Sequence, residues 1–123
     1  MNKIGPPELD DRLSTGASPY ILDIRPRKSY QRSHIDGSQN VPVYNDLRRG
    51  DDAELRQSLS QIPADEPVVT VCKAGVVARK ATTVLEEEGY EAVTLAGGMR
   101  RWSGYQNGSL GYRLASFVRR ALP

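Results

Sequence analysis

Short apolar runs and segments with helical spacing follow one another along the chain, and together they predict alternating strands and helices. Residues 20–24 are apolar on both faces, as strands are when both sides of their sheet are covered. Residues 68–71 form a β-branched run that is typical of a short strand. Residues 91–95 and the short, edge-like run 41–43 are further strand candidates. Helix-start signals or apolar spacing predict helices over 6–13, 27–32, 53–59 and 78–88, whereas the polar segment 45–52 predicts a connection.

This alternation predicts an α/β fold in which a parallel sheet is covered by helices on both faces. The chain has 123 residues and a hydrophobic content of 38%, which suits one domain with a core of its own. Ligands of such sheets bind beyond the carboxyl ends of the strands. Candidate functional residues are therefore sought directly after the predicted strands.

The segment after residue 102 differs in composition. Residues 103–111 are rich in Gly, Ser and Asn, which predicts a linker or loose turn. Residues 112–122 predict an extra helix with one apolar face, formed by Leu114, Phe117, Val118 and Ala121. We therefore expect a main domain over residues 1–104, then a linker and a C-terminal amphipathic helix over residues 105–123. That helix could pack on its own domain, contact a partner, begin a further module or, least expected, touch a membrane surface.

Composition and charge argue against several classes of function. The net charge of +2, without a clustered basic face, gives no indication of nucleic-acid binding. No apolar run approaches the ~20 residues of a membrane span. Residues 1–7 lack an apolar core, so we expect no signal peptide. The single cysteine leaves no internal disulfide and suits a reducing compartment, so we expect a cytoplasmic protein. With one histidine and one cysteine, we expect no metal site built by the protein.

Cys72 directly follows the apolar run 68–71 and precedes a turn with Gly75 and the start of a helix. Unpaired N–H groups and the positive end of the helix dipole meet at such a place, and both favour negative charge on the sulfur. The thiolate is the nucleophilic form of cysteine. A lone buried cysteine is nevertheless more often a small hydrophobic residue without a role, so its position alone leaves both interpretations open.

Residues 72–78, Cys-Lys-Ala-Gly-Val-Val-Ala, resemble the active-site loop of the rhodanese family of sulfurtransferases. Three further elements resemble this family and come in its order. They are Asp-Ile-Arg-Pro at 23–26, His-Ile-Asp-Gly-Ser at 34–38, and the Gly-Gly-x-x-x-Trp pattern at 97–102. The resemblance covers roughly residues 7–104, and it implies a rhodanese-like fold with a central parallel sheet of about five strands.

The resemblance also implies a function. Cys72 would take a sulfane sulfur from a donor such as thiosulfate, hold it as a persulfide, and pass it to a thiol, cyanide or protein acceptor, without a cofactor. The residues expected to bind the donor and the persulfide are Lys73, Ala74, Gly75, Val76, Val77, Ala78 and Arg79. Asp23 and Arg25 are expected to support the loop, and His34 to be a turn residue. Many single-domain relatives have arginine where this chain has Val77, which argues against strong thiosulfate binding.

Two other functions stay open. The domain could be a non-catalytic or regulatory binding module that keeps the loop but turns over no donor. Less expected is a phosphatase or arsenate-handling enzyme on the same fold. Tyrosine phosphatases have a cysteine, then five residues, and then an arginine that binds the phosphate. Here Ala78 occupies that place and Arg79 comes one position too late. Val71 also stands where that class usually has histidine.

Overall fold

A five-stranded sheet forms the centre of the computed structural model, which describes residues 2–108. All strand pairs are parallel, and the strand order is β1-β5-β4-β2-β3. The strands are β1 (Lys3–Ile4), β2 (Tyr20–Asp23), β3 (Gln39–Asn40), β4 (Val68–Val71) and β5 (Ala92–Leu95). The predicted α/β fold is thereby confirmed, and β4, which leads into Cys72, is the central strand.

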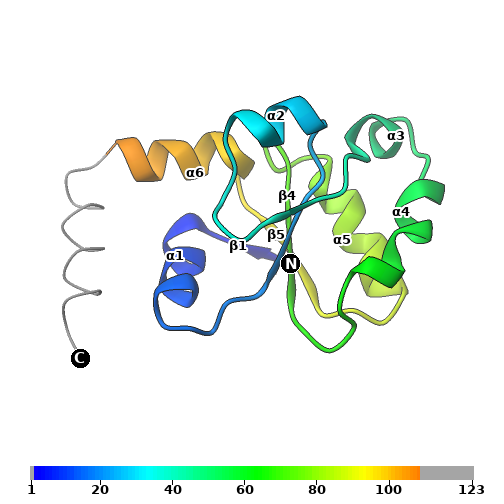
Figure 1. Cartoon of the computed structure of the whole chain (residues 1–123), viewed down its shortest axis with the longest axis horizontal. Helices are drawn as coiled ribbons and strands as arrows, with labels where there is room; N and C mark the ends of the chain where they lie inside the picture. Colours follow the sequence, from blue (N-terminus) through cyan, green and yellow to red (C-terminus); the bar gives the residue numbers. More distant parts are fainter. Residues whose placement is uncertain (1, 109–123) are drawn as a thin grey trace.

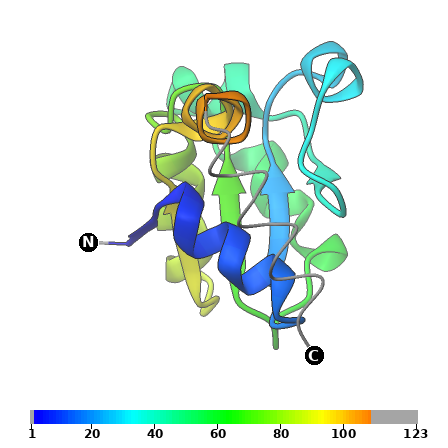
Figure 2. The same ribbon diagram turned by 90° about the vertical axis from the view of Figure 1, so that its left-hand side faces the viewer.

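Helices cover both faces of this sheet (Figure 1). They are α1 (Pro6–Ser14), α2 (Arg27–Arg32), α3 (Tyr44–Arg48), α4 (Ala53–Gln57), α5 (Ala78–Glu87) and α6 (Gly98–Asn107), with a 3₁₀ helix at Leu59–Gln61. Helices α3, α4 and α5 lie on one face, and α1 and α6 lie in front of the strands on the other (Figure 2). Within residues 2–108, no helix has both the length and the apolar character needed to cross a bilayer.

The alternation of side chains along β4 sorts the core into two clusters. Val68 packs with Leu22 and Leu85 on the face covered by α5. Val69 and Val71 pack on the other face with residues of α1 and α6, among them Trp102. A strand with valines on both faces therefore serves two cores.

The edge of the sheet differs from expectation. The third strand is Gln39–Asn40 rather than residues 41–43. The N–H of Val41 still donates to the carbonyl of Asp23 (3.0 Å), but the N–H of Val43 turns back to the carbonyl of Val41 (2.8 Å). The proline between these two valines has no N–H with which to continue a ladder. Val41 and Val43 are buried in the core all the same.

Two short elements were not predicted. Helix α3 lies inside the segment expected to be a polar connection, and its single buried residue, Leu47, anchors it to the core. Strand β1 is only two residues long and pairs with β5. Neither element is long enough for apolar periodicity to reveal it.

The last described helix runs further than the composition suggested. Helix α6 continues to Asn107, so the prediction of a loose segment is wrong for residues 103–107. Trp102 is buried in the core, and the hydroxyl of Tyr105 donates to the Asp10 carboxylate of α1 (3.0 Å). The predicted helix over residues 112–122 lies outside the described residues.

Candidate active site

Cys72 lies at the carboxyl end of the central strand, with its sulfur facing two backbone N–H groups. The N–H of Gly75 is 3.1 Å from Sγ and the N–H of Ala78 is 3.4 Å from it. The first belongs to the turn after β4 and the second to the first residue of α5. Two amides within the predicted set of residues 73–78 therefore converge on the sulfur, in a geometry that stabilises negative charge.

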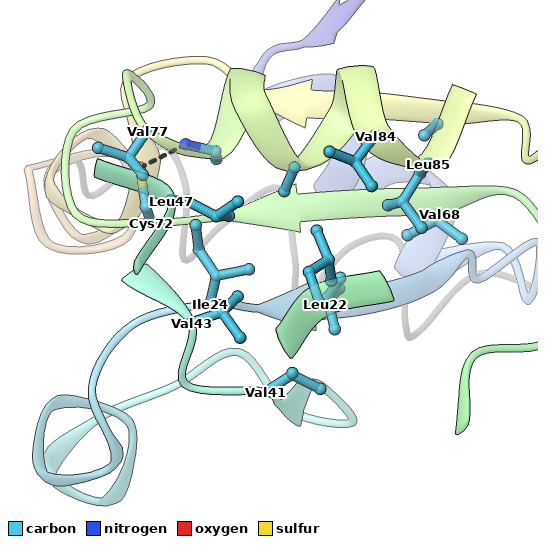
Figure 3. Close-up of a cluster of buried hydrophobic side chains, with 14 of the residues drawn as sticks. Leu22, Ile24, Val41, Val43, Leu47, Val68, Cys72, Val77, Val84 and Leu85 are labelled. Carbon is cyan, nitrogen blue, oxygen red and sulfur yellow. Dashed lines mark hydrogen bonds between the residues drawn. The ribbon is translucent and has the colours of Figure 1, made fainter. Parts of the chain in front are cut away.

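Hydrocarbon surrounds the rest of the sulfur. Cys72 is only 1% exposed and belongs to the core cluster on the α5 face. Figure 3 shows it beside Val77 and Leu47, with a dashed hydrogen bond to the start of α5. Val77 is 7% exposed, whereas its neighbour Val76 is 61% exposed. The thiol thus combines oriented amides with a dry environment, in which such dipoles act more strongly than they do in water.

The start of α6 forms backbone hydrogen bonds to the cysteine loop. The N–H of Met99 donates to the carbonyl of Cys72 (2.8 Å), and the N–H of Arg100 donates to the carbonyl of Lys73 (2.9 Å). These bonds use N–H groups that a helix start leaves free. They fix the peptide groups that directly precede the amides facing the sulfur. This backbone contact was not predicted, since it leaves no mark on the identity of residues 99 and 100.

Glycines make this close approach possible. Gly98 has φ 59°, and a Cβ there would lie 2.3 Å from the carbonyl oxygen of Cys72. Gly75 has φ 82°, and a Cβ there would lie 2.8 Å from the N atom of Gly97. Positive φ values disfavour L side chains in any case. The Gly-Gly pair of the sequence motif is thus a packing surface for the cysteine loop.

A chain of buried threonine hydroxyls fixes the start of α5. Thr70 donates to the carbonyl of Ala78 (3.0 Å), and its Oγ1 also lies 2.8 Å from that of Thr82. The Thr82 hydroxyl lies in turn 2.7 Å from that of Thr94. The chain joins α5, β4 and β5 directly beneath the N–H of Ala78 that faces the sulfur. Threonine is common in strands, so Thr70 and Thr94 carried no signal of this network.

Asp23 and Arg25 form a buried ion pair rather than a direct contact to the cysteine loop. Arg25 Nη2 lies 2.7 Å from Asp23 Oδ2, and it also donates to the carbonyl of Ser33 (2.7 Å). The link to the active-site strand is made by the backbone, where the N–H of Ile24 donates to the carbonyl of Val71 (2.9 Å). The pair therefore fixes the segment after α2, beside the loop.

The two cations expected to contact the donor line different cavities. Lys73 lines a cavity of about 370 Å³ together with Arg25 and Arg32. Arg79 lines one of about 430 Å³ that also includes Gly75. The thiol itself lines neither cavity. The sequence grouped both cations as donor contacts, and the structure separates them.

His34 is exposed and lies against another aromatic ring. Its ring stacks on Tyr30 at a centroid distance of 4.0 Å, and its Nδ1 lies 2.8 Å from the Tyr30 carbonyl. It lines neither of the cavities beside the cysteine loop. This position agrees with the interpretation of His34 as a turn residue. Within residues 2–108, no cluster of three or more His, Cys, Asp or Glu side chains offers a metal site.

Comparison with known proteins identifies the family of this domain. The model of the family described as the rhodanese-like domain matches residues 5–105. Over 101 residues, the chain is 32% identical to MoeZ of Mycobacterium tuberculosis, described as a probable adenylyltransferase/sulfurtransferase. That match covers 81% of this chain and 24% of MoeZ, so the chain spans about a quarter of that relative. Over 92 residues, it is 32% identical to the thiosulfate sulfurtransferase GlpE of Shewanella oneidensis, covering 74% of this chain and 82% of GlpE.

A solved structure gives the same result for the fold. The rhodanese-like domain protein from Staphylococcus aureus is 25% identical to this chain, with a TM-score of 0.70. The match covers 83% of this chain and 91% of that protein. The family match spans every element described above except β1 and the last residues of α6. This chain belongs to the rhodanese-like domain family.

Proposed function

We propose that this domain is a sulfurtransferase that carries sulfane sulfur as a persulfide on Cys72. The observation that carries the proposal is the pair of backbone N–H groups at 3.1 and 3.4 Å from Sγ. They are held by the contacts of α6 behind the loop and by the threonine chain beneath α5. Such fixed dipoles need no reorganisation when negative charge arrives. The relative described as a thiosulfate sulfurtransferase supports the same function.

In the first half-reaction the Cys72 thiolate attacks the outer sulfur of thiosulfate. A new S–S bond forms to Cys72, the S–S bond of thiosulfate breaks, and its electron pair leaves with sulfite. The negative charge ends on the outer sulfur of the persulfide. The amides of Gly75 and Ala78 are the groups we assign to this anion, together with the further N–H groups of residues 73–78.

In the second half-reaction an acceptor removes that outer sulfur. Cyanide attacks it, the S–S bond to Cys72 breaks, and the thiolate is restored as thiocyanate forms. A thiol acceptor, on a small molecule or on a protein, would leave with a persulfide of its own by the same displacement. Both steps are nucleophilic substitutions at sulfur, so neither requires a metal or an organic cofactor. A reducing compartment such as the cytoplasm would keep both thiols available.

The donor has to reach a sulfur that is 1% exposed. The short side chain of Val77 lies over the thiol (Figure 3), so we infer that Val77 and its loop move when a donor binds. We assign the first contact of an anionic donor to Lys73, whose cavity also carries Arg25 and Arg32. We assign this role to Lys73 rather than to Arg79, which lines the separate cavity of about 430 Å³.

A regulatory binding module is the second candidate, and the burial of Cys72 favours it. Such a module would keep the loop as a scaffold, with Val76 exposed for a partner. The phosphatase alternative needs an arginine beside the thiol, but Arg79 lines a cavity that excludes Cys72. Each alternative predicts a different catalytic result.

Steady-state kinetics with thiosulfate and cyanide test the proposal. Thiocyanate formation with parallel double-reciprocal lines, abolished in Cys72→Ser, is the expected result because the two half-reactions share one covalent intermediate. Absence of turnover with thiosulfate and with organic persulfides would support the binding module. Hydrolysis of an aryl phosphate that depends on Cys72 would support the phosphatase.

A further inference from the structure

The face of β1 and β5 that lies beside α5 carries a cavity of about 430 Å³. Lys3 of β1 pairs in register with Thr94 of β5, and the next pair is Ile4 with Leu95. Ile4 and Leu95 are buried in the cluster under α1 and α6. Since side chains alternate along a strand, Lys3 and Thr94 point to the opposite face, where they line the cavity.

Three elements each contribute one cation to this cavity. They are Lys3 of β1, Arg79 in the first turn of α5, and Arg101 of α6. Within residues 2–108, none of the three forms an ion pair with a carboxylate. The one carboxylate of the lining, Glu86, accepts a hydrogen bond from the side chain of Asn2. The lining therefore has an excess of positive charge that is not neutralised by its neighbours.

The stem of Arg101 passes close to Gly97 at the cavity. A Cβ at Gly97 would lie 2.7 Å from Arg101 Cδ, so the stem crosses Gly97 where a larger residue would displace it. Arg79 has its neighbours Thr82, Thr83 and Glu86 along the same stripe of α5. The cations thus stand on regular elements, which position a binding group more firmly than loops do.

Thr82 and Thr94 form the floor of this cavity, and the threonine chain fixes which hydroxyl donates to which. The single hydroxyl hydrogen of Thr70 goes to the carbonyl of Ala78. Thr82 must then donate to Thr70, and Thr94 must donate to Thr82, because each hydroxyl has only one hydrogen. Thr94, at the end of the chain, keeps an acceptor that is not used by this network. The floor is therefore suited to a ligand that donates a hydrogen bond.

We propose that this cavity binds a phosphate ester that bears a hydroxyl or amino group, of about the size of a mononucleotide. The phosphate would contact Lys3, Arg79 and Arg101, which match its charge, and the donor group would face Thr94. A volume of about 430 Å³ falls within the range of small-molecule sites. The site goes beyond the sulfur-transfer function and does not depend on it, although its lining shares Ala74 and Gly75 with the cysteine loop.

Titration of the ¹⁵N-labelled chain with AMP at low salt tests this site by NMR. Saturable shifts of the amides of Thr82, Thr83, Thr94 and Ala96 are expected, with none from adenosine, which lacks the phosphate. The double variant K3M/R101M keeps both aliphatic stems. It should lower the affinity for AMP at least about tenfold, because charge-assisted hydrogen bonds to the phosphate are lost. Thr94→Val should weaken the binding of AMP more than the binding of sulfate, which has no hydrogen-bond donor at neutral pH.

The matched control is R32M/K73M, which removes the same charge from the other cavity beside the loop. It should leave the AMP affinity within about twofold. The proposal is overturned if AMP shifts only amides around the other cavity, such as those of Ser29, Ser33 and Asn45, or if its shifts do not saturate. It is also overturned if the two double variants weaken AMP equally. Persulfide formation at Cys72 needs no AMP, so either proposal can fail while the other stands.

Discussion

Replacing Gly98 by alanine should separate the position of the sulfur cradle from the overall fold. A Cβ at residue 98 would lie 2.3 Å from the Cys72 carbonyl oxygen and 2.6 Å from the Lys73 carbonyl carbon. An ordinary contact is about 3.4 Å or more, so the loop or the start of α6 has to move by about 1 Å. The positive φ of 59° adds about 1–2 kcal/mol of backbone strain.

That displacement acts on the peptide groups that orient the amides of Gly75 and Ala78. A misplacement of about 1 Å in a catalytic constellation can lower a rate by about 100-fold. We therefore expect Gly98→Ala to lower the kcat of thiocyanate formation by about that factor. The same variant should change the rate at which iodoacetamide alkylates Cys72, which reads the thiol environment without any sulfur transfer.

Gly16→Ala is the matched control for backbone strain. Gly16 also has a positive φ, 82°, but a Cβ there would meet nothing within 4 Å. Its substitution should cost about 1–2 kcal/mol of unfolding free energy and leave kcat unchanged. Circular dichroism melts establish that both variants are folded at the assay temperature. The reasoning is refuted if folded Gly98→Ala retains the kcat and the alkylation rate of the Gly16→Ala control.

Three further predictions concern side chains around the loop. Lys73→Met should raise the KM for thiosulfate by up to about fivefold, as loss of an exposed charge contact would, while Arg79→Met should not; equal effects would contradict the division between two cavities. Thr70→Val should lower the unfolding free energy by about 1–3 kcal/mol in urea, whereas Thr83→Val, on an exposed site, should change it little; a reversed order would contradict the threonine network. Asp23→Asn should destabilise by about 3 kcal/mol or more, since it leaves a buried guanidinium unpaired; a change below about 1 kcal/mol in urea would argue against the pair.

The strands and the longer helices could be predicted because their apolar positions repeat over enough residues. Residues 68–71 form a β-branched run, and β4 packs into both cores. The apolar stripe of α5 likewise faces the core, with Ala81 and Leu85 buried. In contrast, Lys3 and Ile4 form a strand only because β5 lies beside them. A two-residue strand depends on its neighbour rather than on a pattern of its own.

The position of the candidate site was predictable, but its geometry was not. The order strand, cysteine, glycine turn and helix placed Cys72 at the carboxyl end of the sheet, as observed. The contacts of Met99 and Arg100 come from residues more than 25 positions away and use only their backbone. The neighbouring Gly98 is the residue whose identity reflects this contact, because a side chain there would collide with the Cys72 carbonyl.

Burial of the thiol is typical of an inert core cysteine, whereas the orientation of the amides is typical of a cysteine that carries negative charge. A sulfur that is 1% exposed resembles an ordinary core cysteine. Yet a core cysteine has no need of two N–H groups at hydrogen-bonding distance. A dry pocket with fixed donors suits an anionic sulfur that must be kept from water between two half-reactions.

Intact-mass spectrometry of the whole chain after treatment with thiosulfate tests the central claim most directly. A gain of about 32 Da, one sulfur atom, should form on the native chain, disappear on addition of cyanide, and be absent from Cys72→Ser. A donor screen that includes organic persulfides covers the case in which Val77 excludes thiosulfate. If no donor adds a sulfur to a folded chain whose Cys72 still reacts with iodoacetamide, the persulfide account is contradicted.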